Sequence, residues 1–223
     1  MRSSAESRTT LLLVVAFALV GSVSGCSLAV MAGKMFFGDP KISSSFTTAT
    51  GIDLTEGEHR LLVMCQAPHL SRDVPTLEYD LTDGILKRLK QAGVKVVSPD
   101  EVSRWLDDNG GEFGDASELA EEFDEADFIA VVELRQIRFK AENSRDMLRG
   151  FAEAAVSGYE IRDVDGHRTA MQVFNNEFRT EHPRFQPIPT HQKSERLFQK
   201  EFIGHLSQQL ARQFHDFRMG DDY

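Results

Sequence analysis

The stretch that specifies the fold is Leu89-Lys90-Gln91-Ala92-Gly93-Val94-Lys95-Val96-Val97-Ser98-Pro99-Asp100-Glu101-Val102. Its first residues end a predicted helix over 77–92, because Gly93 favours the left-handed conformation that terminates helices. Residues 94–97 form a short apolar strand. Ser98 and Pro99 then supply an N-cap and a proline at the first position of the next helix. A helix, a glycine, a strand and a helix in this order indicate an α/β domain.

The segments on either side extend this pattern. Upstream, Arg60 to Gln66 is a continuous apolar run, which suits a strand covered on both faces. Downstream, a helix is predicted over 117–123 and a strand over 128–134, with an extension to Phe139 left open. These spacings favour a partly parallel sheet.

The second half reads as antiparallel. Strands are predicted over 151–162 and 167–180, and Asp165-Gly166 between them is a strong hairpin signal. Prolines make 182–192 a loop, and the last helix runs over 193–217. Its aromatic and leucine residues recur at helical spacing, which favours packing on the sheet over membrane insertion. We therefore predict an α/β fold with an α+β tendency, in which a mixed sheet of about five strands has the order β-α-β-α-β-β-β-α and is flanked by helices.

The N-terminus carries an export signal. Arg2 and Arg8 precede the apolar run of residues 11–20, and small residues follow it. Val23-Ser24-Gly25-Cys26 resembles the bacterial lipoprotein signal, or lipobox. That resemblance implies that the Cys26 thiol receives a diacylglycerol and that cleavage makes Cys26 the new N-terminus. The domain would then lie on the exported side of the cell membrane or outer membrane, held by acyl chains.

An uncleaved anchor is the alternative, because residues 11–33 hold no charged side chain and are long enough to span a bilayer. Glycines and serines interrupt the run after Val20, which favours the cleaved signal. The expected organisation is a signal peptide over 1–25, a lipidated N-terminus and tether over 26–58, one α/β domain over 59–218 and a tail over 219–223.

Composition restricts the partners. The chain has 25 Lys and Arg against 35 Asp and Glu, a net charge of −10. Removal of residues 1–25 would leave a net charge of about −11, because Glu6, Arg2 and Arg8 leave with the signal. Such a domain repels nucleic acid and anionic lipid surfaces, so the acyl chains must hold it to the membrane. Lipidation of Cys26 also leaves Cys65 without a disulfide partner.

Acidic residues are concentrated between Trp105 and Leu134, a segment without Lys or Arg. As a calcium loop, its ligands would be Asp107, Asn109, Asp115 and Glu118 at positions 1, 3, 9 and 12. However, Gly111 occupies a ligand position and Glu112 stands where the turn glycine belongs. The favoured interpretation is a solvated acidic surface or a dock for a basic partner, with no metal.

No other motif predicts catalysis. Cys65 lies in an apolar run, where an inert thiol is favoured over a nucleophile paired with His69, because no third group orients that pair. The seven histidines do not cluster in sequence; His182 and His191 bracket the proline loop, and His205 and His215 lie apart on the last helix. The chain has no nucleophile elbow, phosphate loop or dinucleotide fingerprint. We therefore expect no cofactor and no catalytic residue.

The element order resembles the small α/β domain shared by the amino-terminal part of TolB, the curli secretion lipoprotein CsgG and the lipoprotein LpoB. The likeness covers about residues 60–215 and rests on residues 60–63, 89–102 and 119–131. It implies a noncatalytic envelope protein that docks on partners. The curli pore lipoprotein has long inserted hairpins, whereas the link over 140–150 is short and polar, which disfavours a pore.

Three functions remain open from the sequence. The first is a lipid-anchored interaction or assembly factor with an envelope protein partner. The second is a periplasmic hydrolase or binding protein for cell-wall or sugar ligands, which needs a deep cleft with converging polar groups. The third is an oligomeric secretion component, which a ring-shaped assembly would support.

Overall fold

The computed structural model describes residues 41–67, 70, 74–110 and 114–218. Ser43–Phe217 forms one compact unit. Its helices are α2 (Ser45–Thr50), α3 (Leu77–Gln91), α4 (Pro99–Asp108), α5 (Ala116–Glu122) and α6 (Glu195–Ala211). Its main strands are β2 (Arg60–Gln66), β3 (Lys95–Val96), β4 (Phe128–Lys140), β5 (Met147–Val164), β6 (His167–His182) and β7 (Ile188–Pro189). Two further short strands, β1 (Lys41–Ile42) and β8 (Phe217–Arg218), pair with each other.

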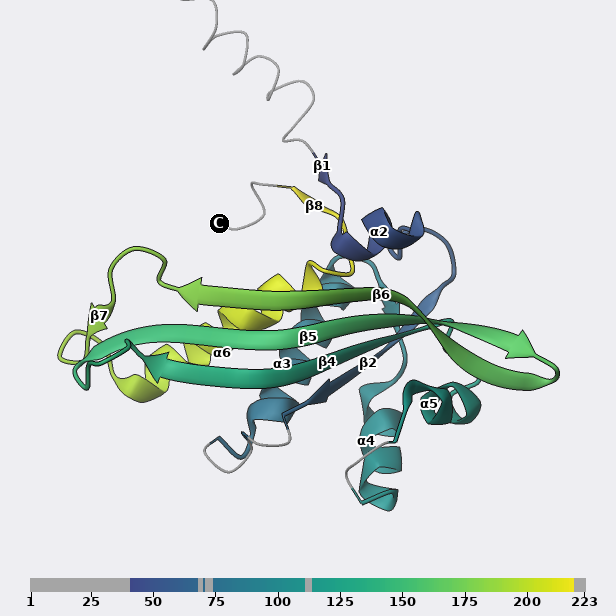
Figure 1. Ribbon diagram of the computed structural model, residues 1–223, viewed down its shortest axis with the longest axis horizontal. Coiled ribbons are helices and arrows are strands. Elements are labelled where there is room, and N and C mark those ends of the chain that lie inside the picture. The colour runs from purple at the N-terminus through teal and green to yellow at the C-terminus, as the bar shows by residue number, and fades with distance from the viewer. Residues whose placement is uncertain (1–40, 68–69, 71–73, 111–113, 219–223) are drawn as a thin grey trace, which may run out of the picture. The chain divides into compact units, whose positions relative to one another are not determined.

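The main sheet has the strand order β3-β2-β4-β5-β6, with β7 paired to β5 (Figure 1). β2 runs parallel to both β3 and β4, whereas β5 is antiparallel to β4 and to β6. The predicted α/β fold with a mixed, helix-flanked sheet is confirmed. Its parallel half comes from the first part of the chain and its antiparallel half from the long hairpin.

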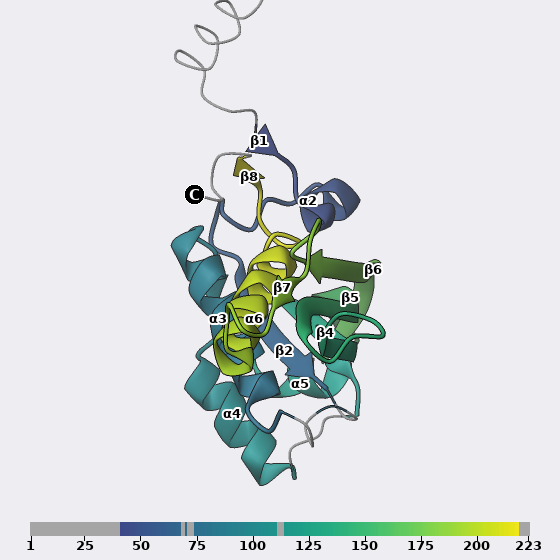
Figure 2. The same cartoon turned by 90° about the vertical axis from the view of Figure 1, so that its left-hand side faces the viewer.

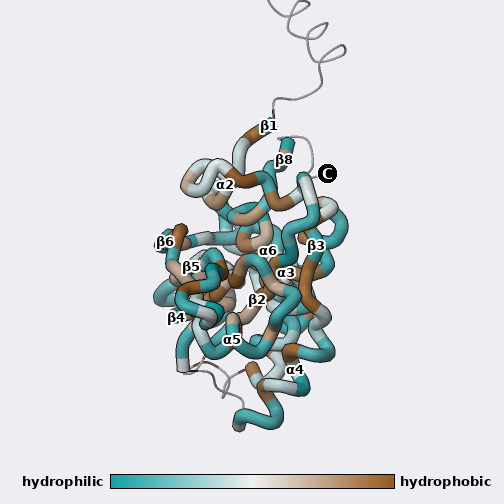
Figure 3. Tube along the Cα trace, turned by 90° about the vertical axis from the view of Figure 1, so that its right-hand side faces the viewer, coloured by the Kyte–Doolittle hydropathy of each residue, from teal (hydrophilic) through white to brown (hydrophobic). Residues whose placement is uncertain are grey.

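Helices cover the two faces of the sheet unequally. α3 and α6 lie on one face, where Leu81, Phe198 and Phe202 are fully or almost fully buried (Figures 1 and 2). α4 and α5 cover the other face around β2, the start of β4, the end of β5 and the start of β6. They pack there over a smaller core that includes Leu62 and Leu119. Hydrophobic stretches of the chain run through the centre, where β2 and its neighbours lie (Figure 3). Over the rest of β4, β5 and β6, none of the helices that the structure describes covers the second face.

The hairpin between β5 and β6 forms as predicted. β5 ends at Val164 and β6 begins at His167, so Asp165 and Gly166 are the two turn residues. Both have positive φ angles, 55° and 83°. A two-residue turn of this kind matches the twist of the strands and favours Asp-Gly. β5 extends beyond its predicted range of 151–162 at both ends, and β6 beyond its predicted end at 180.

The last helix is shorter than predicted. α6 ends at Ala211 rather than Phe217, although the apolar stripe continues to the fully buried Phe214. The chain leaves the helix because the carbonyl of Gln213 accepts a hydrogen bond from Phe46 N at 2.9 Å. The α2 segment thus takes a carbonyl that a longer helix would have used. The predicted loop over 182–192 also contains a short strand, β7.

The segment expected as a tether contributes to the domain. Within 26–58, Ser45–Thr50 is the helix α2, capped by the Ser44 side chain, and Phe46 is fully buried. The Phe46 ring packs against Phe128, Phe174 and Phe214 at centroid distances of 5.4, 6.3 and 6.0 Å. The compact unit therefore begins at Ser43, upstream of the expected boundary at 59. Residues 1–25, the lipobox and Cys26 lie outside the described residues.

Candidate functional site

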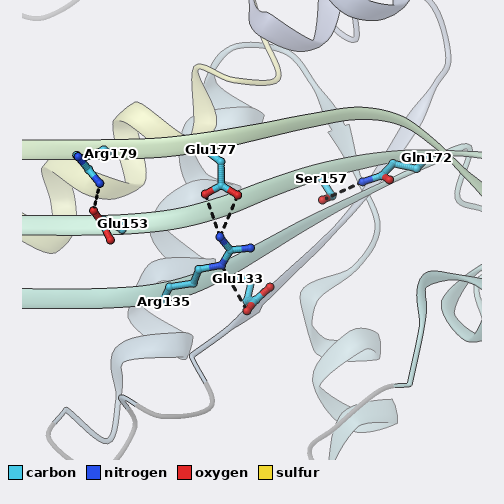
Figure 4. Close-up of polar contacts among 7 residues, drawn as sticks. All are labelled: Glu133, Arg135, Glu153, Ser157, Gln172, Glu177 and Arg179. Carbon is cyan, nitrogen blue, oxygen red and sulfur yellow. Dashed lines mark hydrogen bonds and ion pairs between the residues drawn. The ribbon is translucent and has the colours of Figure 1, made fainter.

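The uncovered face of the sheet carries a network of charged and polar side chains. We call it the open sheet face (Figure 4). It lies opposite α3 and α6, and its labelled members come from all three antiparallel strands. They are Glu133 and Arg135 on β4, Glu153 and Ser157 on β5, and Gln172, Glu177 and Arg179 on β6.

Arg135 links the two outer strands of this face. Its Nη1 donates to both carboxylate oxygens of Glu177, at 2.9 and 3.0 Å, and its Nε lies 3.7 Å from Glu133 Oε1. The side chain crosses β5 above Ala155, the register partner of both Glu133 and Glu177. A β-bulge between Leu134 and Gln136 supplies the extra residue at this position. A small residue below and a bulge beside it thus allow one arginine to bridge three strands.

A second cluster lies further along the same face. Arg179 forms an ion pair with Glu153, which lies opposite it in the β5–β6 register. The guanidinium carbons of Arg138 and Arg179 lie 4.5 and 5.9 Å from the centre of the Phe151 ring. Both distances are within the range of a cation–π interaction. This part of the open sheet face therefore combines a half-buried aromatic ring with two cations.

A cleft lies along the edge of β2 that faces away from β4. It is a cavity of about 530 Å³ between α3 and α4, at the sheet edge where β3 ends. Val63, Met64 and Cys65 of β2 line its floor, and Leu86 and Val102 are among its apolar walls. Its size falls within the range of small-ligand pockets.

Cys65 behaves as the sequence predicts, as a buried thiol. It is 8% exposed, and burial raises the pKa of its thiol to about 12. A hydrogen bond with Thr82 opposes this shift, and the Glu78 charge adds to it. A thiol with such a pKa is almost wholly protonated at neutral pH and is a poor nucleophile. His69, its proposed partner, lies outside the described residues.

The acidic segment between Trp105 and Leu134 lies in α4, α5 and the turn before β4. Arg60, from outside the segment, forms an ion pair with Glu125, and its backbone N donates to Asp127. A second cavity of about 480 Å³ lies between α4 and α5, with Trp105 and Phe123 among its lining residues. The segment is thus an acidic surface with an aromatic contact beneath it, and a cation from β2 neutralises part of it.

Asp115 and Glu118, two of the four candidate calcium ligands, have other hydrogen-bond partners. Asp115 is the N-cap of α5 and accepts from the backbone N of Ser117 at 2.6 Å, while Glu118 accepts from Gly114 N at 2.8 Å. Asp107 lies near the end of α4, and Asn109 is its C-cap residue. Among the described residues, no group of three or more His, Cys, Asp or Glu side chains is placed to hold a metal ion.

The structure brings together two histidines that the sequence left apart. The rings of His182, at the end of β6, and His205, on α6, lie 4.5 Å apart between their centres. Burial lowers the pKa of His182, with an opposing effect from Glu201. This pair could not be predicted from the sequence, because 22 residues and a loop separate its members.

The sequence also missed the open sheet face. Charged residues alternate at Glu177, Arg179 and Glu181 in the printed sequence, which is the period-2 signal of a face directed to solvent. That signal could have identified the strand face. It could not have identified the Arg135 bridge, because the bulge that places Arg135 is invisible in the alternation.

No family model matches the chain, and no curated protein sequence matches it significantly. Solved structures with a similar chain arrangement include bacterial lipoproteins. A hypothetical protein of Chlamydia trachomatis is 13% identical, with a TM-score of 0.40, over 71% of this chain and 94% of that one. Lipoprotein GNA1162 of Neisseria meningitidis is 12% identical, with a TM-score of 0.38, over 69% and 98%. A PelC dodecamer from Paraburkholderia phytofirmans is 9% identical, with a TM-score of 0.41, over 79% and 97%. Likenesses at these TM-scores carry no argument about activity or partners.

Within the described ranges, no helix has the length and apolar character needed to cross a membrane.

Proposed function

We propose that this chain is a lipid-anchored lipoprotein of the bacterial cell envelope that acts as a noncatalytic interaction and assembly factor. The lipid anchor is inferred from the lipobox, Val23-Ser24-Gly25-Cys26. The docking role is inferred from the open sheet face, which would hold a protein partner. The main support for docking on this face is the cluster in which Arg138 and Arg179 lie over the Phe151 ring.

A solvated face is ordinary for an antiparallel sheet, so exposure alone does not support docking. This face differs in its composition and order. Arginine and aromatic residues are the types enriched at protein interfaces. The Arg135–Glu177 and Arg179–Glu153 pairs hold their side chains in place before any partner arrives. Pre-ordered side chains lower the entropy cost of association.

The charges on this face also describe the partner. Within the two clusters, Glu133, Glu153 and Glu177 lie beside Arg135, Arg138 and Arg179, so three acidic and three basic side chains meet there although the whole chain carries −10. Such a mosaic favours a partner surface with its own mixed charges and an apolar group for the Phe151 ring. It disfavours simple attraction of a polycation, which the acidic residues of α4 and α5 would serve better.

The test uses the full chain in its native membrane. A photo-cross-linking residue at Ser157, on the open sheet face, should give a recurrent adduct with one envelope protein, and the same residue at Lys200, exposed on α6, should not. Arg138→Glu should abolish the adduct, whereas Lys200→Glu, which changes the charge equally, should preserve it. An adduct that survives Arg138→Glu would refute docking on this face.

The anchor is tested separately by the intact mass of the protein from the same membranes. A mass equal to residues 26–223 plus acyl chains supports lipidation of Cys26. An unprocessed N-terminus refutes it and leaves the docking experiment unaffected.

A further inference from the structure

The cleft between α3 and α4 has an unusual floor, because β2 has an unpaired edge there. β3 pairs with β2 only at Arg60↔Lys95 and Leu61↔Val96. Beyond Val97 the chain turns into α4 and leaves the edge of the sheet. Residues 63–66 of β2 therefore line the cleft, and no strand within the described part of the chain pairs with them on that side.

The hydrogen bonds of β2 show which of its backbone groups point into the cleft. The carbonyl of Arg60 accepts from Asp127 N, on the β4 side, and the carbonyl of Leu61 accepts from Val97 N, on the β3 side. Because the N–H and C=O of successive residues in a strand point to alternate sides, those of Val63 and Cys65 also point to the β3 side.

Ala67 is the next residue whose backbone groups point to the β3 side. Its backbone N donates to Glu78 Oε1 on α3, at 2.6 Å. For Val63 and Cys65, no hydrogen bond from a described residue reaches the N–H or C=O on the cleft side. Both residues are buried, with 4% and 8% of their surface exposed. Unpaired N–H and C=O groups along a strand edge are a template on which a further strand can pair.

We propose that the cleft binds a short peptide segment in extended conformation, which adds to β2 as a strand in the position that β3 vacates. In an extended main chain, every second residue directs its N–H and C=O groups to the same side, which is the spacing of Val63 and Cys65. Such a chain can therefore form hydrogen bonds with the cleft-side N–H and C=O groups of both residues at once. This site is distinct from the open sheet face and does not depend on the docking role proposed for that face.

The walls of the cleft define the peptide further. α3 packs on the same side of the sheet as the Val63 and Cys65 side chains, and α4 on the side of Met64. Alternate side chains of an added strand would therefore face α3 and α4. The apolar walls favour apolar residues in the middle of the peptide.

Charged groups at the rim of the cleft indicate which charges the bound peptide carries on each side. On α3, Lys87 is paired with Asp83, but Lys90 has no ion pair among the described residues. On α4, Asp100 and Asp107 likewise have none within the described part of the chain. The bound segment therefore carries an acidic residue on the side of α3 and a basic residue on the side of α4.

The test measures binding of a blocked hexapeptide, acetyl-Val-Glu-Val-Leu-Lys-Val-amide, to the full chain by titration. Two isomers carry backbone N-methyl groups, one on the Glu and Leu residues and the other on the central Val and the Lys. Only one set of N–H groups can face β2, so one isomer should bind as the parent does and the other should lose about tenfold or more in affinity. Amide exchange at Val63 and Cys65 should slow when the parent peptide binds.

Two variants of α4 complete the test. Ser103 lines the cleft and is exposed, so Ser103→Trp should fill the cleft and abolish binding. Arg104→Trp, at the next exposed position, lines the other cavity and should leave binding unchanged. The proposal is overturned if the parent peptide does not bind at about 1 mM, the weak end of the affinity scale. It is equally overturned if both N-methyl isomers bind alike, or if Ser103→Trp binds as the wild type does.

Discussion

Replacement of Gly150 by alanine tests how closely α6 approaches the sheet. Gly150 lies on β5, and a Cβ atom placed there would lie 2.2, 2.3 and 2.5 Å from Cδ2, Cγ and Cε2 of Phe202. The Phe202 ring is fully buried. It lies edge-on to Phe139 at 6.0 Å and stacks with Phe198 at 6.4 Å, so these two rings limit its movement.

The size of the effect follows from these distances. Carbon atoms pack at about 3.5–4.0 Å, so the Phe202 ring and β5 must separate by more than about 1 Å to admit the methyl group. Overpacking of a core costs about 1–3 kcal/mol, and the enclosed ring places Gly150→Ala near the upper end, at about 3 kcal/mol. For a domain of this size that corresponds to a fall in Tm of about 6–12 °C. Urea unfolding followed by circular dichroism measures the change in free energy.

The control is the same substitution in a Phe202→Leu background. Phe202→Leu alone leaves a cavity and destabilises the domain, but it removes the ring atoms that the new methyl group meets. Gly150→Ala should then cost about 1–2 kcal/mol less than in the wild type, because contacting residues couple by this order. A neutral Gly150→Ala, or a cost that Phe202→Leu does not reduce, would refute the close approach of α6 to β5.

Three further predictions concern single side chains. Arg168 donates to the carbonyls of residues 120, 123 and 126, at and just after the end of α5, at 2.9, 3.4 and 2.6 Å. Arg168→Met should lower the free energy of unfolding by about 2–3 kcal/mol and speed amide exchange in α5. Unchanged exchange would contradict the role of Arg168 as a cap. The thiol pKa of Cys65 is about 12, against an ordinary 9.0. In a chain whose other cysteine is replaced by serine, Cys65 should react with a disulfide reagent at pH 8 about a thousandfold more slowly in the folded than in the unfolded protein. Equal rates would show that Cys65 is not buried. Burial lowers the pKa of His182 below 6.5, so above pH 6.5 both states leave this ring neutral, and stability is lost as the pH falls through the lowered folded value. His182→Phe should reduce the loss between pH 8 and pH 5 in urea unfolding, and an unchanged loss would assign it to other groups.

Features with local causes could be predicted from the sequence. The helix before Gly93, the proline at the start of α4 and the Asp165-Gly166 turn each depend on the backbone preferences of one or two residues. The continuous apolar run of β2 and the stripe of α6 depend on burial, and both were found. These signals specify the elements and most of their order.

Features that depend on distant contacts could not be predicted. Phe46 belongs to the core because Phe128, Phe174 and Phe214 surround it, and its Ser- and Thr-rich surroundings resemble a tether. α6 stops early because the same α2 segment binds the carbonyl of Gln213. In each case a residue more than 80 positions away determines the local structure, and local sequence carries no trace of it.

The two proposed binding surfaces arise where the covering of the sheet stops. β2 is buried on both faces, so five of its successive residues are buried, whereas burial along Leu148 to Ala154 alternates because only α6 covers that part of β5. The alternation places the half-buried Phe151 ring, with Arg138 and Arg179 beside it, on the open sheet face. In the parallel half, helices pack on both faces of β2, and the covering stops instead at an edge. β3 has only two residues, and among the described residues no strand pairs with Val63 and Cys65 on the β3 side. The covering of the sheet thus stops in two different ways, at a face in the antiparallel half and at an edge in the parallel half.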